Sequence, residues 1–144
     1  MGKEVLVTIC GVQMADGEVT EPIEVVSTGQ RYEKNGKIYV VFEEVVNEDT
    51  NEELGKIVKN TIRIDGEQLD IIKRGEGGTH RVFKEGQSNQ TYYNTPYGNM
   101  EITLTTAMLN IRVEEDIIEA AAKYDLEVNH VQIAECSVSI QVKG

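Results

Sequence analysis

Apolar and polar residues alternate through almost the whole chain, and this period of two constrains the fold more than any other feature of the sequence. Successive side chains of a β-strand point to opposite faces, so a strand with one buried face carries this alternation. Gly, Asn, Asp and Pro interrupt the pattern at short intervals, as is typical of tight turns. The sequence therefore predicts an all-β chain of about nine strands.

Two dipeptides mark hairpins between these strands. Asn35-Gly36 and Asp65-Gly66 tolerate the positive φ angles of a type I′ turn, so each is expected to join two adjacent antiparallel strands. The first turn is predicted to bring Tyr32 close to Ile38. Further turns are predicted at residues 75–78 and 96–99, and the longest loop at residues 47–55.

The segment from Glu114 to Val128 contains many good helix formers, including a run of three alanines. Its apolar residues nevertheless alternate with polar or small ones from Ile118 to Val128. A helix would scatter these apolar groups around its circumference, whereas a strand gathers them on one face. The alternation therefore predicts a strand here.

Antiparallel strands in this number must close on themselves or form two packed sheets, because an open sheet exposes unpaired edges. Parallel strands would need crossover helices, and the sequence contains no clear helical period. The long strands at the two ends of the chain can pair and remove the edges. We therefore predict one domain over residues 1–144, an antiparallel and mostly up-and-down β-barrel.

Three segments, in their order and spacing, resemble the YwiB-like family of small bacterial proteins of unknown function. They are Thr28-Gly29-Gln30-Arg31-Tyr32, Lys37-Ile38-Tyr39-Val40-Val41-Phe42-Glu43-Glu44 and Tyr93-Asn94-Thr95-Pro96-Tyr97-Gly98-Asn99-Met100-Glu101-Ile102. The resemblance implies a calycin-like barrel, the architecture of lipocalins and fatty-acid-binding proteins. It also implies a strand over residues 118–128. It supplies no catalytic or binding residues.

Charge and cysteine content restrict the class of partner. The formal net charge is -11 and the pI is about 4.6, which argues against binding to nucleic acid or to an anionic membrane. The sequence shows no apolar run long enough to span a membrane and no signal-peptide core, so we expect a cytoplasmic protein. Cys10 and Cys136 form no metal-binding spacing and are expected to be reduced and half-buried.

The sequence contains no motif that points to a reaction. His80 and His130 have no second ligand at metal spacing, and no phosphate-binding loop, nucleophile elbow or dinucleotide fingerprint occurs. We therefore expect no metal, no cofactor and no catalytic residue. An enzyme is the least favoured class.

Cationic and aromatic residues of the middle strands are the remaining candidates for a binding site. Lys59, Thr61 and Arg63 share one strand face, which is plain solvated surface if the opposite, apolar face packs the core. Alternatively, cationic groups converge with tyrosines near the mouth of the barrel and bind an anion by charge-assisted hydrogen bonds. This second hypothesis names Arg63, Arg74, Arg81, Tyr39, Tyr93 and Tyr97 as ligand-binding residues.

Two functional classes follow from the barrel. The first is a module that binds a small apolar or anionic molecule in the lumen, since a barrel of about eight strands is either filled by side chains or holds one small ligand. The second is a packed barrel without a ligand, a structural or interaction domain that meets a partner through a strand edge or through residues 47–55. Either is compatible with a monomer or a homodimer.

Overall fold

The computed structural model describes residues 2–15, 18–19, 23–46, 56–74, 79–95 and 98–144. These residues form one antiparallel sheet of eleven strands, and none of the described segments is a helix that could cross a membrane. The strands are β1 (Lys3–Ala15), β2 (Glu18–Val19), β3 (Ile23–Lys34), β4 (Lys37–Val46), β5 (Lys56–Asp65), β6 (Gln68–Lys73), β7 (Thr79–Lys84), β8 (Ser88–Thr95), β9 (Gly98–Val113), β10 (Ile117–Val128) and β11 (Val131–Lys143). The predicted loop at 47–55, the turn at 75–78 and residues 96–97 lie outside the described residues.

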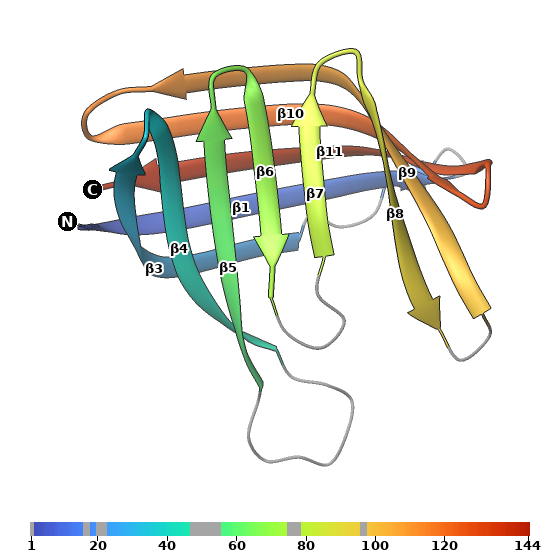
Figure 1. Cartoon of the computed structure of the whole chain (residues 1–144), viewed down its shortest axis with the longest axis horizontal. Helices are drawn as coiled ribbons and strands as arrows, with labels where there is room; N and C mark the ends of the chain where they lie inside the picture. Colours follow the sequence, from blue (N-terminus) through green and yellow to red (C-terminus); the bar gives the residue numbers. More distant parts are fainter. Residues whose placement is uncertain (1, 16–17, 20–22, 47–55, 75–78, 96–97) are drawn as a thin grey trace.

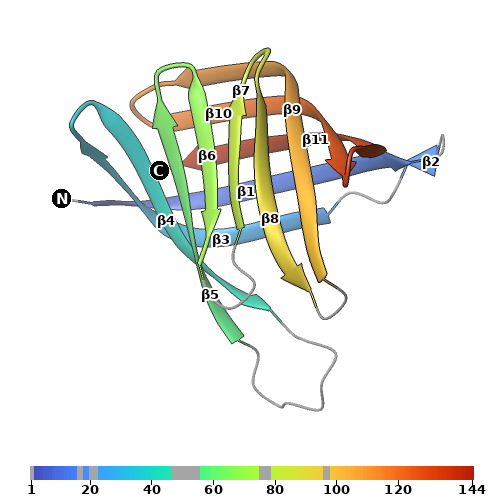
Figure 2. The same ribbon diagram turned by 45° about the vertical axis from the view of Figure 1, so that its right-hand side comes forward.

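The sheet curls into a nearly closed antiparallel barrel, because the first strand pairs with the last (Figures 1 and 2). The strand order is β7-β6-β5-β4-β3-β1-β11-β10-β9-β8, and the short β2 pairs with β1 outside this path. The order ends at β7 and β8, which follow one another in the chain. The gap in the hydrogen-bonded ladder therefore lies between these two strands, and we call this gap the seam.

Alternate residues of the long strands fill the barrel interior, as the period of two predicts. The segment that was open to a helical interpretation is strand β10, and its residues Ile118, Ala120, Ala122 and Tyr124 are buried. The other members of the core are Val5, Val7, Val40, Phe42, Ile62, Ile64, Leu69, Phe83, Leu104, Val138, Ile140 and Val142. The predictions of an antiparallel barrel and of a strand over residues 118–128 are confirmed.

The first predicted hairpin turn is also confirmed. Asn35 and Gly36 both have positive φ angles, 55° and 77°, as a type I′ turn requires. Tyr32 and Ile38 lie close together on adjacent strands, as predicted: Tyr32 stands directly opposite Tyr39, the next residue after Ile38. A turn of two residues pairs Lys34 with Lys37, and counting outward from that pair fixes the register.

Arg31 connects β3 to the turn between β9 and β10. It is buried, and its Nη1 donates hydrogen bonds to the carbonyl oxygens of Glu114 (3.0 Å) and Glu115 (3.1 Å). Asp116 of the same turn is bound by Lys3 Nζ (2.9 Å) and by the Gly144 backbone N–H (3.1 Å). Residues from β3 and from both ends of the chain thus hold this turn in place.

We expect Arg31→Met to lower the free energy of unfolding by about 2–4 kcal/mol, because a hydrogen bond from a charged group contributes about 1.5–3 kcal/mol and two carbonyls lose their donor. Urea denaturation followed by circular dichroism measures the change. Arg112→Met is a matched control on the exposed outer face, and we expect it to change stability by no more than about 0.5 kcal/mol. An Arg31→Met protein as stable as the control would contradict this assignment.

The turn between β10 and β11 is formed by Asn129 and His130, whose φ angles are 50° and 69°. The Asn129 N–H donates to the Glu101 carbonyl (2.8 Å), and Asn129 Oδ1 accepts from the Glu101 N–H (3.0 Å), so the turn is bound to β9. Histidine adopts this left-handed conformation at a cost in free energy that glycine avoids.

We expect His130→Gly to raise the free energy of unfolding by about 1 kcal/mol, because it relieves the left-handed strain. The exposed ion pair of His130 with Glu101 that is lost contributes little. Gly36→Ala is the reverse test, since a Cβ at this position meets no atom within 4 Å and only its φ of 77° opposes the change. Thermal unfolding should move in opposite directions for the two variants, and equal shifts would argue against strain as the cause.

Candidate functional site

Arg63 and Tyr39 lie opposite one another on β5 and β4, on the outer face of the barrel. Their neighbours Ile62 and Val40 are buried in the core, so the alternation directs Arg63 and Tyr39 outward. The Tyr39 ring stacks on Tyr32 with ring centroids 5.2 Å apart. These two predicted site residues are therefore neighbours of one another, but the structure does not bring them into the lumen.

Two other predicted residues, Arg74 and Tyr93, lie on β6 and β8 or next to them. Arg74 is exposed just beyond the end of β6, where its N–H donates to the Lys59 carbonyl at 2.9 Å. The backbone of Tyr93 pairs with Met100 on β9, and its side chain is outside the description. Tyr97 lies outside the described residues.

Arg81 is the predicted residue that faces the interior. It lies on β7 on the same face as the fully buried Phe83, and it pairs with Ile71. Burial raises the pKa values of Tyr124 and Cys136, which project into the barrel from β10 and β11, and the charge of Arg81 acts in the opposite direction on both. Arg81 is nevertheless exposed, so the barrel interior is open to solvent on this side.

Arg81 differs from the other lumen-facing cation near it in having no acidic partner. The Lys73 ammonium lies 2.8 Å from Glu44 Oε1, and this pair is electrically neutral. Arg81 has no ion pair and no hydrogen bond with any other described side chain. A planar guanidinium with five N–H donors is thus available to a ligand.

The seam beside Arg81 is closed at one end and open at the other. At the closed end, the Gly86 N–H donates to the Thr106 carbonyl (2.9 Å) and the Thr106 N–H donates to the Gln87 carbonyl (3.0 Å). Further along, Asn89 Nδ2 donates to the Val82 carbonyl at 3.3 Å. Beyond this point β8 turns away from β7 (Figures 1 and 2).

A small pocket occupies this opening, with a volume of about 70 Å³. It is lined by Ile102, Leu104, Leu126, Arg81, Asn89 and Thr91, and by the strand segment of His80 and Val82. His80 and Val82 alternate with Arg81 along β7, so their side chains point to the outer face. No described carboxylate lines it. A water molecule needs roughly 10–15 Å³ by a comparable measure, so the pocket has room for several waters or for one small polar group with a short apolar chain. We call it the seam pocket.

His80 is held in place by a buried carboxylate that the sequence-based hypothesis missed. His80 Nε2 lies 2.8 Å from Asp70 Oδ2, and Gln68 Nε2 donates to Asp70 Oδ1 at 2.8 Å. The Asp70 side chain is only 3% exposed. Aspartate is uncommon inside strands, so an Asp in the middle of the apolar β6 segment was the available signal.

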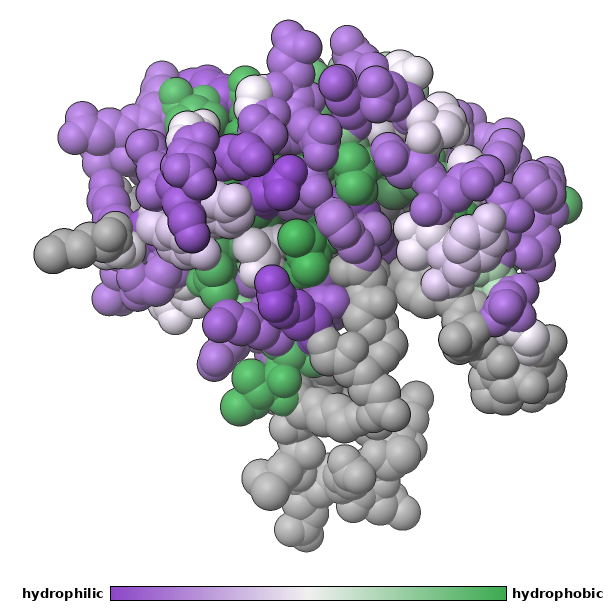
Figure 3. Space-filling model, in the orientation of Figure 1, coloured by the Kyte–Doolittle hydropathy of each residue, from purple (hydrophilic) through white to green (hydrophobic). Residues whose placement is uncertain are grey.

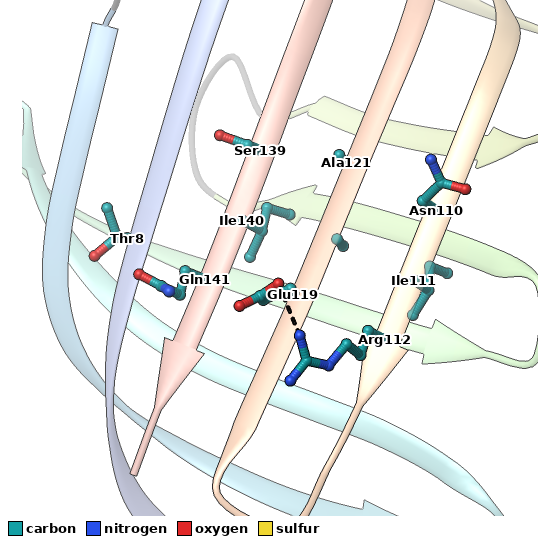
Figure 4. Close-up of a pocket in the computed structure, with 10 residues that line it drawn as sticks. Thr8, Asn110, Ile111, Arg112, Glu119, Ala121, Ser139, Ile140 and Gln141 are labelled. Atoms are coloured by element: carbon teal, nitrogen blue, oxygen red, sulfur yellow. Dashed lines mark ion pairs between the residues drawn. The ribbon is translucent and has the colours of Figure 1, made fainter.

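A larger hollow than the seam pocket lies on the outer face of β1, β9, β10 and β11 (Figure 4). It measures about 540 Å³ and exists because Thr8, Ala121 and Ser139 are short. Its arginine, Arg112, is already paired with Glu119 (3.6 Å) and Glu114 (3.0 Å). This outer groove therefore offers no unpaired charge, and the seam pocket is the better candidate site.

The structure describes both cysteines of the chain. Cys10 and Cys136 are free and half-buried, as expected. Within the described ranges, no group of three His, Cys, Asp or Glu side chains is arranged to hold a metal ion.

Fold and site together define a nearly closed antiparallel β-barrel whose Arg81, beside the seam, has no acidic partner among the described residues. The chain belongs to the family described as "Domain of unknown function (DUF1934)", whose model matches residues 7–140. It is 24% identical over 124 residues to the "Uncharacterized beta-barrel protein YwiB" of Bacillus subtilis (strain 168), covering 86% of this chain and 82% of that protein. The resemblance to YwiB-like proteins is confirmed.

The fold is similar to that of a solved relative. The crystal structure of the ywiB protein from Bacillus subtilis matches this structure with a TM-score of 0.80 at 22% sequence identity, covering 99% of this chain and 92% of that chain. At this identity the match concerns the fold alone, and it supports the antiparallel barrel. The calycin-like plan stays a prediction.

Thiol chemistry can test the inward position of Arg81. Burial raises the pKa of Cys136, while a hydrogen bond with Tyr124 and the charge of Arg81 act in the opposite direction. In a Cys10→Ser background, we therefore expect Arg81→Gln to raise the pKa of Cys136 further and to slow its alkylation by iodoacetamide near neutral pH, because the thiolate is the reactive form. Arg74→Gln is the control and should leave the rate unchanged. An unchanged rate in Arg81→Gln would place Arg81 away from the thiol.

Proposed function

We propose that the protein is a small-molecule-binding β-barrel whose ligand carries an anionic group and binds at the seam pocket. The observation that carries the proposal is Arg81, an inward-facing guanidinium that has no acidic partner among the described residues, in a chain of net charge -11. Arginine binds carboxylates and phosphates through short, charge-assisted hydrogen bonds, often two at once. Such a group in an acidic protein is best explained by an anion that arrives from outside.

The walls of the pocket support a ligand with a short apolar part. Ile102, Leu104 and Leu126 present aliphatic surface next to the guanidinium, while Asn89 and Thr91 add neutral hydrogen-bonding groups. Small-molecule sites commonly combine apolar walls with a few placed polar groups. The volume of about 70 Å³ suits a carboxylate with a few carbons better than a long lipid chain. The proposed ligand class is therefore a small organic acid.

The rival function, a packed barrel that acts through protein contacts, has less support. On the face shown in Figure 3, hydrophobic residues form small separate patches among hydrophilic ones. Docking surfaces usually gather apolar residues into a larger continuous patch. A cytoplasmic location remains part of our proposal, and the free cysteines support it because reduced thiols are usual in that compartment.

Butyrate is a suitable probe, because it combines a carboxylate with a short apolar chain. We expect butyrate, but not 1-butanol or butylamine, to shift the backbone amide resonances of Arg81, Asn89 and Thr91 in an NMR titration. Arg81→Gln should weaken butyrate binding by about 10- to 100-fold, which corresponds to the roughly 1.5–3 kcal/mol of a charge-assisted hydrogen bond.

Arg112→Gln removes a cation from the outer groove and serves as the matched control, with butyrate affinity unchanged. Native mass spectrometry of the purified protein tests the same proposal without a chosen probe, since a co-purifying organic acid should appear as a non-covalent mass lost on denaturation. Equal affinity for butyrate and 1-butanol, or no shift with any probe and no co-purifying mass, would refute the proposed function.

A further inference from the structure

The edge of β8 that faces the seam carries main-chain groups that the barrel does not use. On β9, the Glu101 N–H and carbonyl are both hydrogen-bonded to Asn129, so they face away from β8. Tyr92 lies directly opposite Glu101, and in an antiparallel ladder its own N–H and carbonyl therefore point away from β9, toward the seam. Alternation along the strand gives the main chain of Gln90 the same direction. None of these groups of Gln90 and Tyr92 bonds to another described residue.

The other side of the seam is the edge of β7, and its separation from β8 increases along the strand. The Lys84 carbonyl accepts directly from the Gln87 N–H at 3.0 Å. Two residues away, the Val82 carbonyl is reached only by the side chain of Asn89, at 3.3 Å. Alternation directs the His80 main chain to the seam as well, and it has no described partner across the seam. The seam thus widens toward the part of β8 whose edge is free.

The free edge of β8 also lacks the features that usually prevent pairing with another chain. Exposed edges are commonly very short or carry charged residues or proline. The β8 sequence contains no charged residue and no proline, and half of it is threonine and tyrosine, which favour strands. Tyr92 is 65% exposed and offers an aromatic surface on the outer face. An extended segment can therefore add to this edge, as in other cases of β-strand addition.

A strand added here would place alternate side chains in the seam pocket. Its residue opposite Thr91 would point into the barrel, because Thr91 lines the pocket together with Arg81. A glutamate at this position carries a carboxylate on a short apolar chain, which matches the guanidinium and the aliphatic walls. The two neighbouring residues of the strand would lie opposite Gln90 and Tyr92 and bond to their main-chain groups.

We propose that the ligand of the seam pocket is a short extended peptide that adds antiparallel to the edge of β8 and places a glutamate side chain against Arg81. The inference rests on the proposed function and makes it more specific, because it names the molecule that carries the acid. Main-chain hydrogen bonds with Gln90 and Tyr92 hold the peptide, and Arg81 selects the acidic residue. A free acid such as butyrate makes the contact with Arg81 alone.

The probe is the peptide acetyl-Thr-Val-Glu-Val-Thr-amide, in which only the glutamate is charged. In NMR titrations we expect it to bind about tenfold or more tightly than butyrate, because main-chain hydrogen bonds add to the same carboxylate contact. Hydrogen exchange of the Gln90 and Tyr92 amides should slow in the complex. Exchange of the Thr91 amide, which faces β9, should not change. A peptide with glutamine in place of glutamate, and one with both valine nitrogens methylated, should each bind about tenfold or more weakly.

Tyr92→Pro tests the edge from the side of the protein. It removes an N–H that the barrel does not use, so we expect the variant to fold and to bind butyrate as the wild type does, while losing the preference for the peptide. Tyr92→Ala is the matched control, because it loses the same side chain but keeps the N–H, and the preference for the peptide should remain. If Tyr92→Pro fails to fold, the methylated peptide carries the test.

The outcomes separate this inference from the proposed function. A glutamate peptide that binds no more tightly than butyrate, or equally well when methylated, would overturn strand addition and leave the proposed function standing. Equal affinities of the glutamate and glutamine peptides would overturn the selection by Arg81. If neither butyrate nor the peptide binds, both proposals are wrong.

Discussion

The pairing of the first long strand with the last is the constraint on which the rest of this structure depends. Strands β1 and β11 share a continuous register from Leu6 and Lys143 to Met14 and Glu135. It places Val7 beside Val142 and Ile9 beside Ile140, so the same contact that closes the sheet also forms part of the core. A sheet without this pairing would expose two long edges and half of its apolar face.

Closure by the terminal strands also decides where the barrel stays open. Apart from the short β2, strands that follow one another in the chain are neighbours in the sheet, except β7 and β8, which are joined by a short turn but lie at its two ends. Buried Phe83 and Tyr124 meet edge to face at 5.1 Å next to the closed end of the seam, and this packing replaces the missing ladder there. Farther along no such packing exists between the described residues, and Arg81 reaches solvent. The candidate site is thus a consequence of incomplete closure.

The fold was predictable from the sequence because its signal is local and repeated. The alternation from Ile118 to Val128 outweighed the helix propensity of the alanines, since burial on one face stabilises a strand more than intrinsic preference favours a helix. Asn35-Gly36 fixed a turn for a similar local reason. The residue directly opposite Tyr32 follows from counting outward from the turn, and it is Tyr39.

The site was less predictable, because it depends on which face of each strand turns inward and on which strands are neighbours. Arg63 and Arg81 are both strand arginines, and the sequence alone does not distinguish them. Arg63 is directed outward beside Tyr39, whereas Arg81 faces Cys136 inside the barrel. The buried carboxylate of Asp70 is hydrogen-bonded by His80, which lies ten residues away on the next strand. Contacts of this kind follow from pairing across the sheet, and no single segment of the sequence contains them.

The barrel can be regarded as a ring of strands that is interrupted twice, in complementary ways. Between β11 and β1 the covalent chain is interrupted while the hydrogen bonds continue, and between β7 and β8 the hydrogen bonds are interrupted while the chain continues. Joining the present ends, and cutting the chain at the turn between β7 and β8, would therefore bring both interruptions to the same place without altering a single strand pair. In such a permuted chain the pairing of β1 with β11 becomes a local hairpin contact. A local pairing costs less loop-closure entropy than the pairing of distant strands, so the permuted barrel is expected to fold faster.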